Sequence, residues 1–330
     1  ANYNAMLSII ECNNVKIWND FLEKEKTNQI VTIAHNPCLG AILSNTFGYS
    51  HKNYYVLEGE DIVGVLPTVT IGGKIVSMPH FSYGGPIFKE SVIDNFNLSS
   101  VFKDFKYEVR SFSKLSDFRN EKKISFVVPL HKKVDDIFMS YTSKMRNKIK
   151  KSEKLGFTIT KNGPNALDHF YALFSKKMLQ KGSPPLGKSF FKNFLEQYTN
   201  GEVEITVVYD GKRPVATGFC LSYLNFKEIC WASTDHNYDR YNVNSFLFWN
   251  LIQESISQGF DYFSMGRSTR NSNNHNYKLQ WNPIEMPLYY NFSEKSTGSI
   301  KDFEFLTKIW KYQPLKTSQI LGHYVSKYVY

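Results

Sequence analysis

Residues 264–283 carry more polar hydrogen-bonding groups than packing or a simple connection requires. They read SMGRSTRNSNNHNYKLQWNP. The apolar segment 260–265, which indicates a strand, stops at Gly266 within this stretch. Gly266 lets the backbone turn tightly, Arg267 can form a two-pronged contact with a phosphate or carboxylate, and the ammonium of Lys278 can stabilise a developing oxyanion. No helical or strand period continues across the stretch. We therefore expect a loop at the carboxyl end of a strand, where α/β sheets often place ligands.

The same residues also have structural interpretations. Arg267 could form a salt bridge between two domains, and Lys278 could be a solvated lysine at the start of a strand. Arg270, Asn274 and His275 could extend a ligand-binding surface, or they could simply satisfy the backbone of a long loop. A general-base role for His275 competes with the simpler interpretation of a surface histidine.

Residues 143–154, SKMRNKIKKSEK, form a strongly basic stretch with helical character. Arg146 and Lys150 lie four residues apart and therefore share a helix face. Such a face can bind the phosphates of a nucleotide-linked glycan, a lipid-linked pyrophosphate or a tRNA backbone. The alternative is a solvated basic helix, which is what most charge runs are.

Two glycines follow a strand in the first half of the chain. In the tripeptide Tyr83-Gly84-Gly85 they permit a close approach of the backbone to a ligand, although a plain turn explains them equally well. The segment KGSPP at 181–185 has the same two interpretations, a rigid loop beside an acceptor cleft or a structural break.

The elements that must position these residues follow one order twice. Apolar residues at helical spacing predict helices, and apolar runs between turn residues predict strands. Helices are expected at 15–29, just before Gly48, and at 166–179, 189–198 and 243–258, and strands at 53–59, 62–71, 74–79, 203–209, 214–223, 227–233 and 260–265. The segments YYVLEGEDIVGVLP and ITVVYDGKRPVATG occupy matching positions. The repetition indicates two related α/β (α+β) domains around mixed sheets.

Bulk properties limit the function classes. The chain has 330 residues, enough for two domains at roughly 100–200 residues each. Its net charge of +10 favours an anionic partner such as nucleic acid, a phosphorylated substrate or an acidic membrane surface. The four cysteines show no metal-binding spacing, so we expect no metal site. No apolar stretch approaches the roughly 18–20 residues that span a bilayer, and no signal peptide is apparent, so we expect a cytoplasmic protein. We expect residues 1–5, ANYNA, to be a cloning remnant.

Taken in order, the motifs resemble the GNAT acyltransferase fold and, more closely, the FemAB-like transferases, which carry two such folds in tandem. The segments that carry the resemblance are VGVLP, SMPHFSYGGP, MRNKIKKSEKLGFTI, KMLQKGSPP, GFDYFSMGRS, YKLQWNP and KIWKYQPLKTSQILG. The resemblance implies GNAT-like domains at 7–140 and 141–310, each with a mixed, mostly antiparallel sheet flanked by helices. The second domain would carry most of the site. A closing helix at 311–330 would pack back on the body.

The resemblance also implies an activity. An acyl or aminoacyl group would move, without a covalent enzyme intermediate, to an amine of a bacterial cell-envelope precursor, such as a nucleotide- or lipid-linked glycan or peptide of peptidoglycan or polysaccharide synthesis. The donor would be aminoacyl-tRNA or acyl-CoA, and the enzyme could contact the inner face of the cytoplasmic membrane. Lys278 matches the Phe-Lys position of the family pattern and would act with Arg267. The expected substrate-binding residues are Tyr83, Gly84, Gly85, Arg146, Lys150, Ser268, Arg270, Tyr277 and Trp281.

One segment departs from the pattern of CoA-dependent relatives. Residues 240–245 read RYNVNS, without the glycines whose backbone N–H groups cradle a pyrophosphate. We therefore expect Asn242 or Asn244 to cap the following helix and the donor to bind differently, as aminoacyl-tRNA would. Two alternatives stay open. One is an acyl-CoA-dependent N-acyltransferase acting on an amino sugar or small amine, and the other is a non-catalytic module that binds a nucleotide sugar or nucleic acid.

Overall fold

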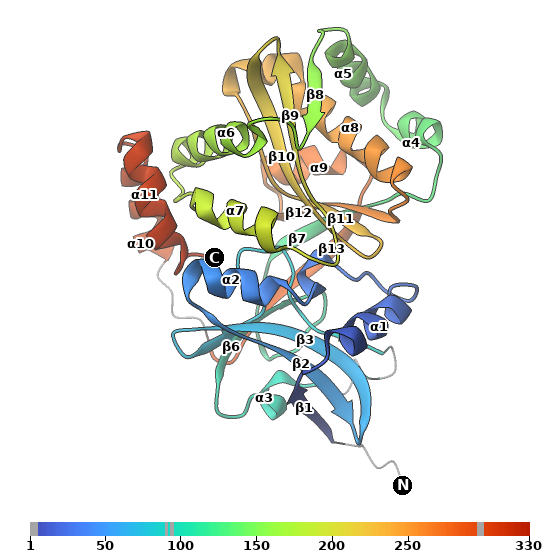
Figure 1. Cartoon of the computed structure of the whole chain (residues 1–330), viewed down its shortest axis with the longest axis vertical. Helices are drawn as coiled ribbons and strands as arrows, with labels where there is room; N and C mark the ends of the chain where they lie inside the picture. The colour runs from blue at the N-terminus through green and yellow to red at the C-terminus, as the bar shows by residue number, and fades with distance from the viewer. Residues whose placement is uncertain (1–5, 90–91, 93–95, 296–299) are drawn as a thin grey trace.

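The structure, a computed structural model, describes residues 6–89, 92, 96–295 and 300–330. Residues 1–5, the expected cloning remnant, lie outside the described residues. Within the described part of the chain, thirteen strands form one sheet that runs through the long axis of the molecule (Figure 1). Most neighbouring strands are antiparallel and helices flank the sheet, so the expected fold class is confirmed. The two expected sheets are, however, joined into one.

The two halves of the sheet have the same topology. In each half four antiparallel neighbours are followed by one parallel strand. The first half consists of β1 (Leu7–Glu11), β2 (Ser50–Glu58), β3 (Asp61–Ile71), β4 (Lys74–Val76) and β6 (Lys106–Ser111). The second half consists of β8 (Thr158–Lys161), β9 (Val203–Asp210), β10 (Arg213–Tyr223), β11 (Phe226–Thr234) and β12 (Tyr262–Thr269). The short β5 (Ile87–Phe88) pairs with β3. The hairpins β2–β3 and β9–β10 thus occupy matching positions, as the internal similarity of the sequence indicates.

The last strand of each half is exchanged with the other half. β7 (Phe118–Pro129) follows β6 along the chain but pairs with β12, and β13 (Ile284–Phe292) follows β12 but pairs with β6. β7 and β13 also pair with each other, which joins the halves. The sheet therefore contains strands from both sides of the expected boundary at residues 140/141. The division into domains 7–140 and 141–310 remains a proposal.

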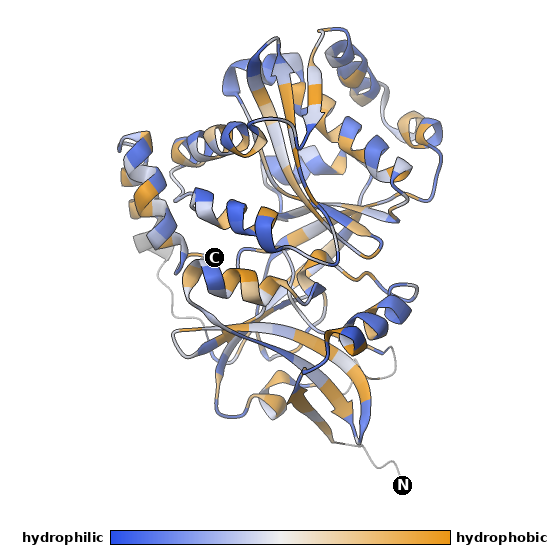
Figure 2. Ribbon diagram, in the orientation of Figure 1, coloured by the Kyte–Doolittle hydropathy of each residue, from blue (hydrophilic) through white to orange (hydrophobic). Residues whose placement is uncertain are grey.

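Helices cover both halves and meet between them. The first half carries α1 (Val15–Glu25), α2 (Leu39–Phe47) and α3 (Leu98–Val101), and the second carries α4 (Val134–Ser140), α5 (Ser143–Glu153), α6 (Ala166–Lys181), α7 (Lys188–Gln197), α8 (Val243–Ser257) and α9 (Asn273–Leu279). α2 and α7 face each other at the junction of the halves (Figure 1). Phe47 of α2 packs against Phe190 of α7, and Phe81 packs against Trp231 of β11. One hydrophobic cluster therefore spans both halves, and Figure 2 shows the hydrophobic stretches of β2, β3, β9 and β10 that contribute to it.

The polar stretch 264–283 is not the single loop that we expected. β12 continues to Thr269, and α9 follows after a short turn. The hydroxyl of Ser272 caps α9 by accepting a hydrogen bond from the backbone N–H of His275 at 3.2 Å. Because α9 has only seven residues, about two helical turns, it is too short to show a helical period in the sequence.

The helix expected at 311–330 is present as α11 (Leu315–Ser326), with Pro314 at its N-cap position, and α10 (Ile300–Trp310), which was not expected, precedes it across a turn. α11 lies against α6 on the flank of the second half (Figure 1). Among the helices of the described residues, none has the length and apolar content required to cross a membrane.

Candidate active site

A cavity opens where β11 and β12 separate. Their parallel pairing joins Phe226–Glu228 to Tyr262–Ser264 and then ends, although both strands continue for several residues. β12 then stays paired with β7 on its other side. The gap between the diverging strands contains a cavity of about 480 Å³. Backbone groups along the separated edges have no partner from the neighbouring strand, so this gap can accept a ligand.

A bulge on each strand shapes the cavity. In β11, Cys230 is an extra residue between the paired positions Ile229 and Trp231. In β12, the register against β7 shifts between Ser264 and Arg267, and Gly266 there has φ +70°. Bulges redirect neighbouring side chains and are frequent beside active sites. Gly266 thus does turn the backbone as expected, but within β12 and not at its end.

Lys278 projects from α9 to the edge of the cavity. Its Nζ donates to the backbone carbonyl of Arg267 at 3.0 Å and lies 5.4 Å from the ring centroid of Phe126. Burial, together with the nearby cations of Lys181, Arg267 and Lys123, lowers the pKa of Lys278 to about 8. The side chain therefore remains mostly protonated at neutral pH. One of its three N–H groups is used by the carbonyl, so the others can serve a ligand.

A buried carboxylate lies behind this lysine. Glu228 belongs to the last parallel pair of β11 and β12, and its Oε1 accepts from the hydroxyl of Ser264 at 2.6 Å. Burial raises the pKa of Glu228, while the charge of Glu228 raises the pKa of Lys278 against the effect of burial. Glu228 is thus the counter-charge that keeps Lys278 protonated inside the protein.

Arg267 links the cavity to the first half of the chain. Its backbone N–H donates to Ser82 Oγ at 3.1 Å, and its guanidinium donates to the hydroxyl of Tyr290 on β13. The guanidinium stacks at 5.9 Å from the Tyr290 ring centroid. Burial, followed by the nearby Arg110, lowers the pKa of Arg267. A partly buried cation that has no carboxylate within salt-bridge distance among the described residues is well suited to attract an anion.

The matching gap in the first half is closed by the chain itself. β4 and β6 also separate after three parallel residue pairs, but the backbone N–H of Gly84 donates there to the carbonyl of Arg110 at 3.1 Å. A Cβ on Gly84 would lie 2.8 Å from Met78 N, and a Cβ on Gly85 would lie 2.7 Å from Ser111 Cβ. Only glycine permits this closure. The glycines therefore fill the first gap, and the open cavity lies in the second half.

The segment that fills the first gap, residues 77–85, also reaches the cavity of the second half. His80 and Ser82 lie in its wall. His80 has φ +71°, an uncommon conformation for a residue with a side chain, and its buried Nε2 has no hydrogen-bond partner among the described residues. Burial and the cations of Arg110 and Arg267 lower the pKa of His80 to about 3, so its ring is neutral. A strained, neutral histidine with a free ring nitrogen is available to hydrogen-bond a substrate.

The remaining walls come from α6 and from the start of α8. Lys177 and Lys181 of α6 line the cavity, and burial together with Lys177 lowers the pKa of Lys181. Asp239 and Asn244 line the end beside α8. With Arg267 and Lys278, the cavity is surrounded by more positive than negative charge. It can therefore hold an anionic substrate and stabilise negative charge that develops during a reaction.

The substrate-binding residues predicted in 264–283 divide into those that line the cavity and those that do not. Tyr277 lines the cavity with Lys278 and Arg267. Trp281 is fully buried in the core, edge-on to Tyr141. The other two lie outside the cavity wall as well: Ser268 is buried on β12, and Arg270 donates to the carbonyl of Glu121 at 2.9 Å.

The other predicted residues lie away from the cavity. Tyr83 is buried, stacks on Phe112 at 4.1 Å and donates to the carbonyl of Pro86. Arg146 of α5 donates to the carbonyl of Tyr141, and Lys150 is exposed on the same helix. α5 packs against α8 at the far end of the second half (Figure 1). The structure does not bring this basic helix to the cavity.

Sequence reasoning missed several residues of the site. Among them, His80 and Ser82 belong to SMPHFSYGGP, Lys177 and Lys181 belong to KMLQKGSPP, and Glu228 belongs to the strand KEICWAS. These five lie within segments that carry the family resemblance or an expected strand. The available signal for Glu228 was the charged pair Lys227-Glu228 at the start of a strand that is mostly apolar further on, because buried charges are rare without a function or a partner.

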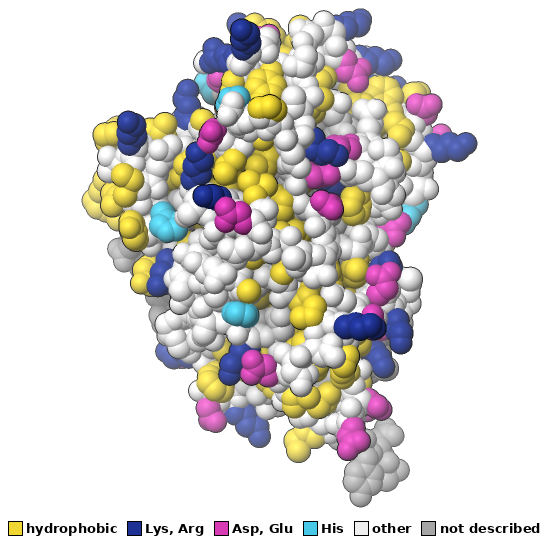
Figure 3. All heavy atoms as spheres, viewed as in Figure 1, with side chains coloured by type: hydrophobic (Ala, Val, Ile, Leu, Met, Phe, Trp, Pro, Cys, Tyr) yellow, Lys and Arg dark blue, Asp and Glu magenta, His cyan; other side chains and the backbone are white. Residues whose placement is uncertain are grey.

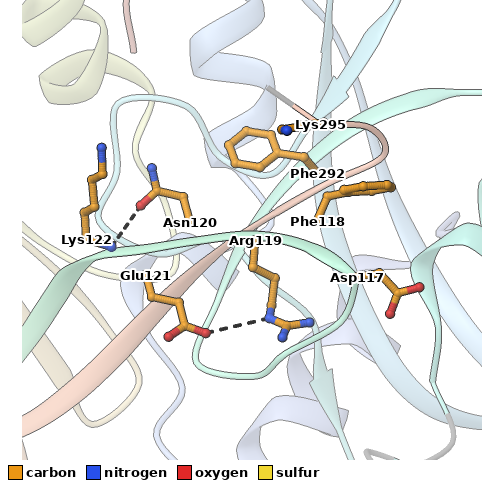
Figure 4. Close-up of a pocket in the computed structure, with 8 residues that line it drawn as sticks. All are labelled: Asp117, Phe118, Arg119, Asn120, Glu121, Lys122, Phe292 and Lys295. Atoms are coloured by element: carbon orange, nitrogen blue, oxygen red, sulfur yellow. Dashed lines mark hydrogen bonds and ion pairs between the residues drawn. The ribbon is translucent and has the colours of Figure 1, made fainter. Parts of the chain in front are cut away.

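A second hollow lies at the start of β7, away from this cavity (Figure 4). Arg119 Nε lies 3.8 Å from Glu121 Oε1, and the backbone N–H of Lys122 donates to Asn120 Oδ1 at 2.8 Å. The side chains alternate above and below the strand and do not converge on one point. This hollow therefore has no arrangement that indicates chemistry.

Comparison with known proteins agrees with this geometry. The sequence model of the acetyltransferase (GNAT) domain family matches residues 139–279. The match begins at the end of α4 and ends with α9, so it includes both diverging strands, α6 and Lys278. These residues form a GNAT domain, which makes the chain an acyltransferase. No curated protein matches the sequence significantly.

Solved structures share the fold over most of the chain. The crystal structure of FemX has a TM-score of 0.63 at 9% identity and covers 86% of this chain and 97% of that one. L-PGS from Bacillus licheniformis has a TM-score of 0.52 at 13% identity, covering 89% and 97%. A tandem GNAT protein from the clavulanic acid biosynthesis pathway has a TM-score of 0.52 at 9% identity, covering 88% and 100%. The resemblance to the GNAT and FemAB-like fold is confirmed.

Proposed function

We propose that this acyltransferase moves an acyl or aminoacyl group directly from its donor to an amine on an anionic cell-envelope precursor. The observation that carries the proposal is the position of Lys278 beside the gap between β11 and β12. Its ammonium is held by the carbonyl of Arg267 and keeps free N–H groups. A donor carbonyl in the gap would therefore meet a fixed positive charge where its oxygen becomes negative.

The proposed reaction needs no enzyme nucleophile. The neutral amine attacks the donor carbonyl carbon, a C–N bond forms, and the ester or thioester bond to the donor breaks. The proton lost by the amine leaves, in net terms, on the released alcohol or thiol. Cys230 lines the cavity, but burial and the adjacent Glu228 raise its pKa well above the usual value. A thiol in this state is a poor nucleophile, which favours direct transfer.

The charge of the cavity favours an anionic acceptor. Lys177, Lys181 and Arg267 all line the cavity and could bind the phosphates of a nucleotide- or lipid-linked glycan or peptide. The FemAB-like resemblance points to peptidoglycan precursors among these. Such an acceptor places the reaction in the bacterial cytoplasm, at the inner face of the membrane.

The donor is proposed to be aminoacyl-tRNA or acyl-CoA, and one observation supports acyl-CoA. The expected side-chain cap of α8 is absent: Asn242 occupies the N-cap position, but its side chain accepts no hydrogen bond. Asn242 has φ +55°, the left-handed conformation that a glycine would supply. The first N–H groups of α8 therefore lack a side-chain cap near the cavity, and a helix N-terminus of this kind can bind phosphate. This supports the second candidate, an acyl-CoA-dependent N-acyltransferase acting on an amino sugar or small amine.

Replacement of the lysine tests the transferase mechanism. Lys278→Met should lower kcat by about 100-fold or more, because one oxyanion contact typically contributes this much, while acceptor binding measured by calorimetry should change little. Lys16→Met, an exposed lysine on α1 paired with Asp20, is the matched control and should behave as wild type. Turnover that survives Lys278→Met would exclude the assigned role. Ligand binding by the wild type without any turnover would instead support the non-catalytic binding module.

A thermal-shift comparison identifies the donor. A ligand that binds the folded state raises the melting temperature, so acyl-CoA, free CoA, tRNA and aminoacyl-tRNA can be ranked directly. Stabilisation by acyl-CoA but not by tRNA would select the second candidate. Stabilisation by tRNA that falls steeply with salt would select the first, because phosphate contacts release counterions.

A further inference from the structure

α11 has its small residues inside, and α10 and α11 together expose most of the large apolar side chains that the structure describes in them. On α11 the buried positions are Ser318, Gly322 and Ser326, which form one stripe at a spacing of four residues. A helix on the surface of a globular protein normally turns its large apolar residues toward the core. α11 reverses this arrangement, and the reversal has to be explained by what lies on its outer face.

The inward face is held by close backbone contacts. A Cβ on Gly322 would lie 2.4 Å from Pro185 Cδ, and a Cβ on Gly182 would lie 2.4 Å from the carbonyl of Thr307. Tyr49 donates a hydrogen bond to the carbonyl of Lys327 at 2.5 Å, and Gln319 donates to Ser175 at 2.9 Å. α11 is therefore fixed on the body largely by small residues and hydrogen bonds, while most of the large apolar side chains described in α10 and α11 stay outside this contact.

Those side chains are exposed. Tyr312 is 89%, Tyr324 69% and Phe305 64% exposed. The other exposed apolar residues of this element are Leu306, Ile309, Ile320, Leu321, Val325 and Tyr328. Figure 3 shows hydrophobic side chains gathered on the lobe that α10 and α11 form at the left of the molecule. An exposed apolar patch of this extent marks an interaction site.

Lysines accompany the patch. Residues 304–330 contain Lys308, Lys311, Lys316 and Lys327 but a single acidic residue, Glu304. Apolar and aromatic residues combined with lysines on a short helix are typical of elements that lie in the interface of an anionic membrane. A second copy of the same face would place like charges opposite each other, which disfavours self-association through it.

We propose that α10 and α11 dock on an anionic lipid surface. The apolar side chains would enter the boundary between headgroups and acyl chains, and the lysines would contact the acidic headgroups. α11 packs on α6, which carries Lys177 and Lys181 of the cavity wall, so docking would hold the cavity close to the membrane. The role of docking in holding the cavity at the membrane rests on the proposed function, and it narrows the acceptor to one presented at a membrane. The lipid contact itself can be tested independently of that function.

Vesicle co-sedimentation tests the contact. The wild type should bind phosphatidylcholine vesicles that contain phosphatidylglycerol and bind vesicles of phosphatidylcholine alone much less. Phe305→Ser combined with Tyr324→Ser should lower the affinity by at least about tenfold, because two apolar side chains lose their burial. Lys308→Gln combined with Lys316→Gln should lower it by about fivefold per lysine at low salt and should reduce the salt dependence. The double variant Phe105→Ser, Met139→Ser removes two exposed apolar side chains elsewhere and should bind as wild type.

Three results would overturn the proposal. The first is equal or absent binding to both kinds of vesicle, and the second is an equal loss in the Phe105/Met139 control. The third is a dimer of the wild type in sedimentation velocity that the Phe305/Tyr324 variant loses, because a second copy would then cover the face. Lys278→Met should bind vesicles like the wild type, so a failure of the transferase assignment leaves this test intact. A failure of lipid binding likewise leaves transfer to a soluble acceptor unaffected.

Discussion

At the scale of single residues, Lys278 combines a positive charge with burial. An ordinary lysine has a pKa near 10.5, whereas Lys278 has a pKa of about 8 because burial outweighs the attraction of Glu228. Arg267 and Lys181 add repulsion, and the carbonyl of Arg267 fixes the position of Nζ. The residue is therefore charged at neutral pH but loses its proton at a pH where most lysines keep theirs.

The pKa of Lys278 predicts a pH dependence of the transfer rate that differs from the effect of this lysine on the stability of the fold. Transfer should fall as pH rises through about 8, because the ammonium proposed to stabilise the oxyanion is lost. Between pH 8 and 10.5 the unfolded chain holds more protons at this site than the folded chain does, so titration of Lys278 makes the fold more stable as pH rises. A rate profile and melting curves recorded over the same range separate the two effects.

A substitution of the counter-charge provides the control. Glu228→Gln removes the carboxylate that raises the pKa of Lys278, so the falling limb of the profile should move to lower pH. A purely structural role for Glu228 would lower the rate equally at every pH. A limb that stays in place after Glu228→Gln would contradict the pairing of these residues.

At the scale of elements, the bulge of β12 decides which way Arg267 and the cavity edge face. Gly266 occupies the left-handed region inside a strand, and its N–H donates to Ser264 Oγ at 3.1 Å. The same serine donates to Glu228. The glycine, the serine and the carboxylate thus connect the shape of the strand to the charge of the site.

Gly266→Ala should lower the free energy of unfolding by about 1–2 kcal/mol, because a side chain in this backbone region is strained, and it should also lower transfer. Gly266→Asn should lose less stability, since asparagine tolerates the conformation better. Gly59→Ala is the matched control: φ is +63° there and no atom lies within 4 Å of the added Cβ. Urea denaturation and turnover should show a stability loss at both glycines but an activity loss only at Gly266. Equal activity loss at Gly59 would contradict a role specific to the bulge.

At the scale of the whole molecule, the exchange of β7 and β13 makes the two halves dependent on each other. Each half receives one strand from the other, and one hydrophobic cluster includes residues of both. Separation of the halves would expose the edges of β6 and β12 together with the aromatic contacts between α2 and α7. Tandem folds joined in this way should behave as one cooperative unit.

We therefore predict one unfolding transition. Far-UV circular dichroism and tryptophan fluorescence should give the same urea midpoint, and the fragment 141–330, which lacks β7, should not reach a stable fold. A Trp18→Phe variant restricts the fluorescence to the second half and should keep that midpoint. Two separated transitions, or a stable fragment 141–330, would show independent domains and support the boundary at 140/141.

The pattern of residues could predict the elements near the site but not all contacts between them. Hairpins 53–71 and 203–223 and helix 243–258 follow from local periodicity, and Gly48 ends α2 in the left-handed conformation as a glycine at a helix end often does. α9 escaped prediction because a helix of seven residues carries too few periods, and no helix was predicted over 300–310. The sequence of α5 predicted a binding role because it shows the density of positive charge. It does not show where the helix lies relative to the cavity.

By itself the sequence determined the repeated α/β order and the acyltransferase resemblance, and it singled out Lys278 and Arg267 as the residues proposed to do the chemistry, because residue type and local spacing are properties of the chain. Only the tertiary structure decided which gap between parallel strands stays open. Gly84 and Gly85 close the first gap by backbone contact, whereas the second is left open between two bulged strands. The structure alone also brought His80, Lys181 and Glu228 to the same place, since contacts between residues this far apart depend on how the strands pair and not on any local pattern.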